Sequence, residues 1–140
     1  MGRFNLSGGA GIAGTADVAG VVVLGTPGSD LAGAIRSAIL AQAALQTPRY
    51  LAEIDLTGGS DDQRWFCSMV FSASAAELPN QSVDLSVGTF YGAEATALQA
   101  SLNAALAAVP DTNTIRLMGF AGAGQGHPCV GIIISTDTTP

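Results

Sequence analysis

The chain has 140 residues, enough to bury the core of one domain, but only 11% are charged, against about 25% in a typical soluble protein. There is no lysine, and five arginines with a net charge of −6 argue against a nucleic-acid partner, because binding phosphates needs clustered cations. No apolar run approaches the roughly 18 residues of a membrane span, and the first residues lack the apolar core of a secretory signal, so we expect no membrane partner.

Residues 1–17 are rich in glycine, alanine and serine, and such a segment cannot fold alone. We therefore expect an extended arm that becomes ordered by lying on a neighbouring molecule. Residues 18–24 are apolar almost throughout, which is typical of a central strand covered on both faces. Residues 31–46 predict a helix whose apolar stripe includes Ile35 and Ile39.

Residues 50–56 and 65–71 alternate between two kinds of side chain and are joined by a polar turn, which predicts a β-hairpin. Because side chains alternate along a strand, Glu53 and Asp55 share one face of the first strand. Cys67 lies on the second strand, on the side that also carries Trp65 and Met69.

The same order of elements follows in the second half of the chain. Residues 83–87 predict a strand, residues 91–109 a helix, and residues 114–120 and 129–135 a second hairpin. The last of these strands is apolar on both faces. Helices on one face of the sheet would leave its other face to be covered by a sheet, a subunit or the N-terminal arm.

A faint internal similarity accompanies this order. When Gly25-Thr26 is aligned with Gly88-Thr89, several alanines and two apolar positions of the predicted helices coincide. We therefore predict an α+β fold of two tandem β-α-β-β repeats, with the helices packed on one face of a mixed sheet and an extended N-terminal arm. The aligned apolar pairs are Ile35 with Leu98 and Ile39 with Leu102.

The predicted boundaries follow from these elements. Residues 1–17 form the arm, residues 18–136 form one domain, and residues 137–140 form a polar tail. Within the domain the repeats cover residues 18–73 and 82–136.

The paired β-α-β units resemble, in topology, those of the tautomerase superfamily, whose trimers duplicate such units. That family uses a proline exposed directly after the initiator methionine. Here Gly2 follows Met1, and the first proline is Pro27. The resemblance therefore carries no catalytic residue over to this chain.

Two glycine-rich segments are candidates for phosphate-binding loops. Residues 9–14 match G-x-G-x-x-G, but no buried strand precedes them and no helix follows, as a dinucleotide site requires. Residues 122–127 lie in the loop of the second hairpin, where glycine permits a turn and no helix dipole adds to anion binding. We expect no cofactor.

The side chains that could support catalysis are few. His127 is the single histidine, so we expect no metal site, and Cys129 is its only nearby nucleophile in the sequence. Cys67 and Cys129 are interpreted as buried thiols, with a disulfide left open. Glu53 and Asp55 are interpreted as a solvated strand face, with acid-base work as the alternative.

The low charge predicts that much of the surface is buried against neighbouring molecules. A GC-rich genome would explain the missing lysine but not the low total charge. We therefore predict a structural, non-enzymatic subunit that forms a homo-oligomer or lattice. A bacteriophage virion protein, either a head decoration or cement protein or a tail component, fits this description best, made in the host cytoplasm and contacting itself and other virion proteins.

Two other interpretations stay open. One is a small oligomeric enzyme or ligand-binding protein, cytoplasmic, with a site at a subunit interface near His127, Glu53 and Asp55. The other is an adaptor that binds one host protein through an exposed strand edge. For the assembly interpretation, the predicted contact residues are Arg3, Phe4, Leu6, Phe66, Val70, Met118, Phe120, His127, Ile132 and Ile134.

Overall fold

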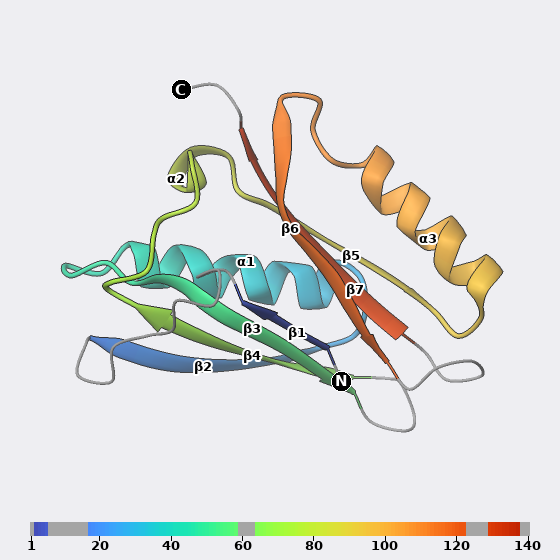
Figure 1. Cartoon of the computed structure of the whole chain (residues 1–140), viewed down its shortest axis with the longest axis horizontal. Coiled ribbons are helices and arrows are strands. Elements are labelled where there is room, and N and C mark those ends of the chain that lie inside the picture. The colour runs from blue at the N-terminus through green and yellow to red at the C-terminus, as the bar shows by residue number, and fades with distance from the viewer. Residues whose placement is uncertain (1, 6–16, 59–63, 123–128, 138–140) are drawn as a thin grey trace.

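The computed structural model describes residues 2–5, 17–58, 64–122 and 129–137. These residues form an α+β fold in which two antiparallel sheets are combined with two long helices and one short one (Figure 1).

The first sheet, sheet A, has the strand order β1-β3-β4-β2. Strands β3 (Tyr50–Gly58) and β4 (Trp65–Ser72) form the first predicted hairpin, which is confirmed. Strand β2 (Val18–Gly25) pairs with the other edge of β4, and helix α1 (Ser29–Ala43) leads from β2 to β3. Strand β1 (Gly2–Asn5), which comes from the predicted arm, pairs with β3 of the same chain.

The second sheet, sheet B, has the strand order β5-β7-β6. A short helix α2 (Gln81–Asp84) leads into β5 (Ser86–Gly92), and helix α3 (Ala95–Ala107) connects β5 to β6. Strands β6 (Asn113–Gly122) and β7 (Cys129–Asp137) form the second predicted hairpin, which is also confirmed.

The prediction of one mixed sheet is wrong. Strands β2 and β3 both pair antiparallel with β4, so they run in the same direction with β4 between them and never become parallel neighbours. Strands β5 and β6 are separated by β7 in the same way. Every pairing between described strands is therefore antiparallel, and each β-α-β-β unit has a sheet of its own.

Three expected element positions are also corrected. The segment expected as a central covered strand is β2, an edge strand with alternately exposed side chains. The second helix begins later than predicted, because Tyr91 still belongs to β5. Gly88 and Thr89, which the sequence comparison aligns with Gly25-Thr26 before the first helix, lie in the middle of β5. The β-branched and aromatic residues around them favour a strand.

Helix α1 lies between the two sheets (Figure 1). It contacts β2, β3 and β4 on one side and β5 on another, and Leu31, Ile35 and Ile39 are fully buried. They share one hydrophobic cluster with side chains from both sheets, among them Ile132 and Ile134 of β7. Helix α3 instead contacts β5 and β7 and has no buried residue, so the helices do not cover one common face as predicted.

The two sheets match each other in register. Their strand orders are β3-β4-β2 and β6-β7-β5 once β1 is set aside. The pairing of β3 with β4 shifts between Leu51 and Glu53, and the pairing of β6 with β7 shifts between Ile115 and Leu117. Each irregularity lies equally far from the last residue of its strand, Gly58 in β3 and Gly122 in β6. The two hairpins therefore bend at corresponding positions.

A glycine that lies close to the following helix ends both β2 and β5. A Cβ on Gly25, the last residue of β2, would lie 2.9 Å from the Cα of Leu31. A Cβ on Gly92, the last residue of β5, would lie 2.8 Å from the Cα of Leu98. Aligning these two glycines shifts the helices by about one turn relative to the predicted alignment. The corresponding apolar positions are Leu31, Ile35 and Ile39 in α1 and Leu98, Leu102 and Leu106 in α3.

Candidate interaction surfaces

Sheet A carries a group of exposed apolar side chains on the face that points away from α1. Their relative exposures are 65% for Val22, 52% for Phe66, 40% for Leu24 and 39% for Val18. The register places Leu24 directly opposite Phe66, so these side chains are neighbours across the two strands. We call these four residues the β2/β4 face. Grouped apolar side chains on a surface with few charges mark a site of interaction.

Two predicted site residues lie beside this face. Glu53 is opposite Val70, and Asp55 is opposite Ser68, so both carboxylates share the outer side of sheet A with Phe66. All but Phe66 and Ser68 are half-buried. The outer side therefore changes from apolar at β2 to acidic at β3.

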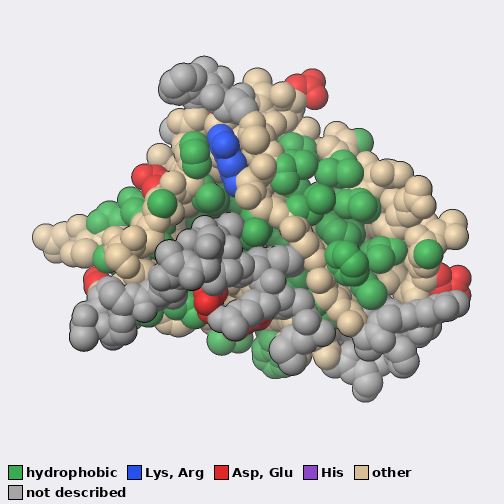
Figure 2. Space-filling view, viewed as in Figure 1, with side chains coloured by type: hydrophobic (Ala, Val, Ile, Leu, Met, Phe, Trp, Pro, Cys, Tyr) green, Lys and Arg blue, Asp and Glu red, His purple; other side chains and the backbone are tan. Residues whose placement is uncertain are grey.

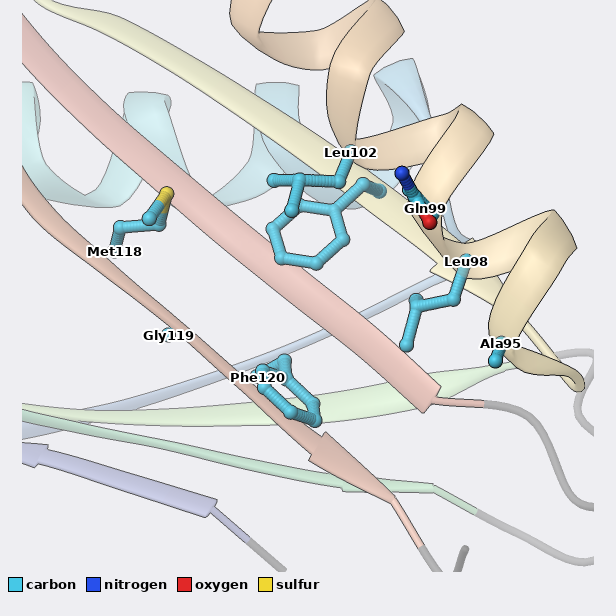
Figure 3. A pocket seen from close by; sticks show the side chains of 8 residues that line it. Ala95, Leu98, Gln99, Leu102, Met118, Gly119 and Phe120 are labelled. Carbon is cyan, nitrogen blue, oxygen red and sulfur yellow. The ribbon is translucent and has the colours of Figure 1, made fainter. Parts of the chain in front are cut away.

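A second apolar surface lies between α3 and β6. It is a groove of about 460 Å³, open to the outside, to which α3 contributes Leu98 and Leu102 (Figure 3). Met118 and Phe120 rise from β6 on the same side of the sheet. We call this surface, which includes Phe90 of β5, the α3 groove.

Aromatic rings form the floor of the α3 groove. The ring centroids of Phe90 and Phe120 are 6.5 Å apart with an interplanar angle of 55°. Phe90 is buried because it lies over Gly131, where a Cβ would come within 2.0 Å of the ring. Phe120 and Met118 are 55% and 48% exposed, and Figure 2 shows hydrophobic side chains gathered over this part of the molecule.

Helix α3 has an unusual surface for a helix that is not buried. Its thirteen residues, ATALQASLNAALA, include no charged side chain and no buried residue. A helix on the surface of a soluble domain ordinarily carries charged side chains on the side away from the core. The outer side of α3 therefore resembles a surface that another molecule covers.

The predicted contact residues fall into separate groups. Phe66 and Val70 lie on the outer side of sheet A, whereas Met118 and Phe120 lie in the α3 groove. These four residues do not share one face, because the two units form two sheets rather than one.

Two of the predicted contact residues are inaccessible. Ile132 and Ile134 have a relative exposure of 0%, so the prediction that they contact a neighbour is wrong. They lie on the middle strand of sheet B and pack in the cluster that contains α1. Strand β7 was expected to need cover on both faces. The face that carries Ile132 and Ile134 is covered by the hydrophobic core of the same chain.

The remaining contact residues belong to the N-terminal segment and the last hairpin loop. Arg3 and Phe4 lie on β1, where their backbones pair with Asp55 and Ile54 of the same chain. Leu6 and His127 lie outside the described residues.

Val22 and Leu24 were not predicted as contact residues. The segment around them is apolar throughout, which is typical of a strand covered on both faces. The structure shows instead that this strand lies at a sheet edge and that every second side chain is exposed. The leucines of α3 were missed for a similar reason, because their spacing is that of any helix packed on a core.

The chemistry of the described side chains is limited. No group of three or more His, Cys, Asp or Glu side chains that could hold a metal ion occurs within the described ranges. Both cysteines are free, Cys67 buried and Cys129 half-buried. Burial, aided by the negative charge of Asp55, raises the pKa of the Cys67 thiol to about 12, so it is not a nucleophile near neutral pH.

None of the helices in the described part of the chain is both long enough and apolar enough to cross a membrane. No protein-family model, curated protein or solved structure matches this chain.

Proposed function

We propose that this chain is a structural subunit that assembles with copies of itself into a homo-oligomer or lattice. The observation that carries the proposal is the pair of exposed apolar surfaces, the β2/β4 face and the α3 groove, on a molecule with so few charges. Burying such surfaces between copies would remove apolar area from water, which favours association by about 25 cal/mol for each Å².

The experiment that tests this proposal is the mass of the full chain in solution. Light scattering and sedimentation velocity over a series of concentrations should give a species of several times the 14.0 kDa chain mass. A chain that stays monomeric at every concentration up to the millimolar range would contradict the proposal.

A narrower form of the proposal is a bacteriophage virion protein, as a head decoration or cement protein or as a tail component. Its support is the small size, the low charge and the apolar surfaces. Quantitative mass spectrometry of purified particles should find the chain in many copies for each particle. Finding it only in the cell lysate would contradict this form and leave self-assembly standing.

The α3 groove favours one second candidate, a binding protein for a small apolar ligand. Its volume of about 460 Å³ lies in the range of ligand pockets, and aromatic and aliphatic side chains line it. Calorimetry with a set of aliphatic and aromatic ligands would distinguish the two. Micromolar binding by a monomeric chain supports this candidate, and binding by no ligand supports assembly.

We also infer that the two β-α-β-β units are tandem copies of one unit. Four correspondences support this: the strand order, the position of the strand irregularity, the helix between the first two strands, and the glycine at the strand–helix junction. Gly58 and Gly122 add a fifth, since a Cβ on either would meet the side chain of Trp65 or Cys129 opposite it. Independent folds would have no reason to agree at all five.

A further inference from the structure

We propose that copies of this chain associate head to tail, with the β2/β4 face of one copy seated on the α3 groove of the next. The contact would repeat, between chains, the packing that α1 makes with sheet B inside the chain. This inference rests on the proposed self-assembly and specifies its geometry.

The internal packing supplies the template. The side of sheet B that meets α1 includes Val130 and Ile134, which share a cluster with Leu31, Ile35 and Ile39. Leu85, just before β5, is in the same cluster, and its carbonyl oxygen accepts a hydrogen bond from Arg36 Nε of α1 at 2.8 Å. Helix α1 is therefore enclosed by its own sheet on one side and by the next unit's sheet on the other.

The corresponding side of sheet A has no such cover. Counting from Gly25 in β2 and Gly92 in β5, Val18 corresponds to Leu85. Val18 is 39% exposed and Leu85 is 3% exposed. The register with the central strand makes Phe66, 52% exposed, correspond to Val130, which is fully buried. Leu85 and Val130 are thus covered in the second unit, while Val18 and Phe66 are open in the first. Leu24 corresponds to Tyr91, and both of these side chains are exposed.

The helices show the converse difference. Leu31, Ile35 and Ile39 of α1 are fully buried, whereas the corresponding leucines of α3 are only half-buried. Helix α3 has one sheet beneath it, while α1 has a sheet on each side. Helix α3 therefore lacks a second sheet like the one that covers α1. The β2/β4 face is the part of sheet A that corresponds to the face of sheet B covering α1.

The two surfaces are therefore complementary rather than alike. Neither carries a charged residue: α3 has none, and the four residues of the β2/β4 face are all apolar. Because each copy presents one surface of each kind, an interface between them leaves one surface free at each end. Such a heterologous contact continues until it closes into a ring or extends as a filament.

Two single substitutions and their mixture test this geometry. Phe66→Glu places a charge on the β2/β4 face, and Phe120→Glu places one in the α3 groove, at exposed positions in both cases. Each variant alone should be largely monomeric in sedimentation velocity, with the dissociation constant raised at least about tenfold. An equimolar mixture should form a dimer, because one intact surface of each kind remains available.

Controls separate folding from association. Leu45→Glu, a charge at a 40% exposed leucine outside both surfaces, should assemble like the wild type. Circular dichroism should match for all variants, and Met118→Glu replaces Phe120→Glu if the latter does not fold.

The outcomes distinguish the two proposals. A monomeric wild type contradicts self-assembly itself. A wild type that assembles while either variant still assembles, or while the mixture stays monomeric, overturns the head-to-tail geometry alone. A wild type that stops at a dimer also overturns it, whereas assemblies larger than a dimer together with a dimeric mixture support it.

Discussion

Helices α1 and α3 each connect the first two strands of a β-α-β-β unit, yet one is a core element and the other lies on the surface. Four residues of α1 are buried and none of α3. The apolar positions correspond in both, so the difference comes from what lies on the far side of each helix. An apolar stripe shows that a helix packs against something, and whether that partner belongs to the same chain depends on the assembly.

The polar residues of the two helices show the same contrast. Asp30 of α1 accepts a hydrogen bond from the backbone amide of Thr26 at 3.0 Å, and Arg36 donates to Leu85. Both charged residues of α1 thus make contacts within the chain. Helix α3 has no charged residue to make such contacts or to face water. Its surface is suited to neither role and is consistent with cover by another molecule.

The largest expected effect comes from truncating corresponding core positions in the two helices. Ile35→Ala should lower the free energy of unfolding by about 2–5 kcal/mol, because it leaves a cavity among fully buried side chains. Leu102→Ala should cost about 1 kcal/mol, because its side chain is already partly exposed to water in the single chain. Urea unfolding measures both, in the Phe66→Glu background so that association does not contribute.

Equal losses at the two positions would contradict the contrast between the helices. In the assembled wild type, by comparison, Leu102→Ala should cost more than in the monomeric background, since the neighbouring copy would then bury it.

The next effect concerns the glycines at the strand–helix junctions. Gly25→Ala and Gly92→Ala should each destabilise the fold by about 1–3 kcal/mol, because the new methyl group would meet backbone atoms of the following helix. Gly33→Ala is the matched control, because nothing lies within 4 Å of a Cβ there and the helix should gain about 0.5–1 kcal/mol. Thermal and urea unfolding measure all three, and a neutral Gly92→Ala would show that α3 does not pack as closely as α1.

These glycines also show what could be predicted from the sequence. Both hairpins, both long helices and the order of the elements followed from periodicity and turn residues. The alignment of the units did not, because an alanine-rich helix matches another almost equally well after a shift of one turn. The alignment inferred above rests on Gly25 and Gly92, whose close approach to the helix backbone is not visible in the sequence.

Strand irregularities limited the prediction of faces. Strict alternation along β3 would place Leu51 on the same side as Glu53, but the register shift between them turns Leu51 into the interior, where it is 2% exposed. The division into two sheets could not be predicted either. The sequence does not show which strand edges pair with one another after each helical connection. Both features decided which candidate contact residues are exposed.

The buried thiol of Cys67 gives a prediction on how stability depends on pH. The Cys67 thiol keeps its proton up to about pH 12 in the folded chain, against an ordinary pKa of 9.0. Between these values the unfolded chain binds fewer protons, so the free energy of unfolding should fall as the pH rises from 9 to 12. Cys67→Ala should remove that part of the fall, and Cys129→Ala should retain it, in urea unfolding at several pH values.

Thiol alkylation of the native protein gives an independent check. Cys129 should react at pH 8 while Cys67 stays protected, because Cys67 is buried and its pKa is raised, whereas Cys129 is half-buried. Equal reaction rates at native conditions would contradict this difference.

The smallest expected effect tests the proposed interface at a single polar contact. Asn103 lies at the position of α3 that corresponds to Arg36 of α1, and Val18 corresponds to Leu85, whose carbonyl oxygen accepts the Arg36 hydrogen bond. We therefore expect the Asn103 amide to donate to the carbonyl oxygen of Val18 in the next copy. Asn103→Ala should weaken assembly by about 0.5–1.5 kcal/mol without changing the stability of the monomer, because the side chain is exposed there.

Replacing Asn103 with the residue that α1 uses makes this test sharper. Asn103→Arg supplies a longer, charged donor to the same carbonyl oxygen and should retain or strengthen assembly, whereas Asn103→Asp, which offers only acceptors, should weaken it. Sedimentation equilibrium gives the three dissociation constants. If Asn103→Arg and Asn103→Asp weaken assembly equally, the position only tolerates small neutral side chains, and the correspondence between the contacts inside and between chains does not extend to this hydrogen bond.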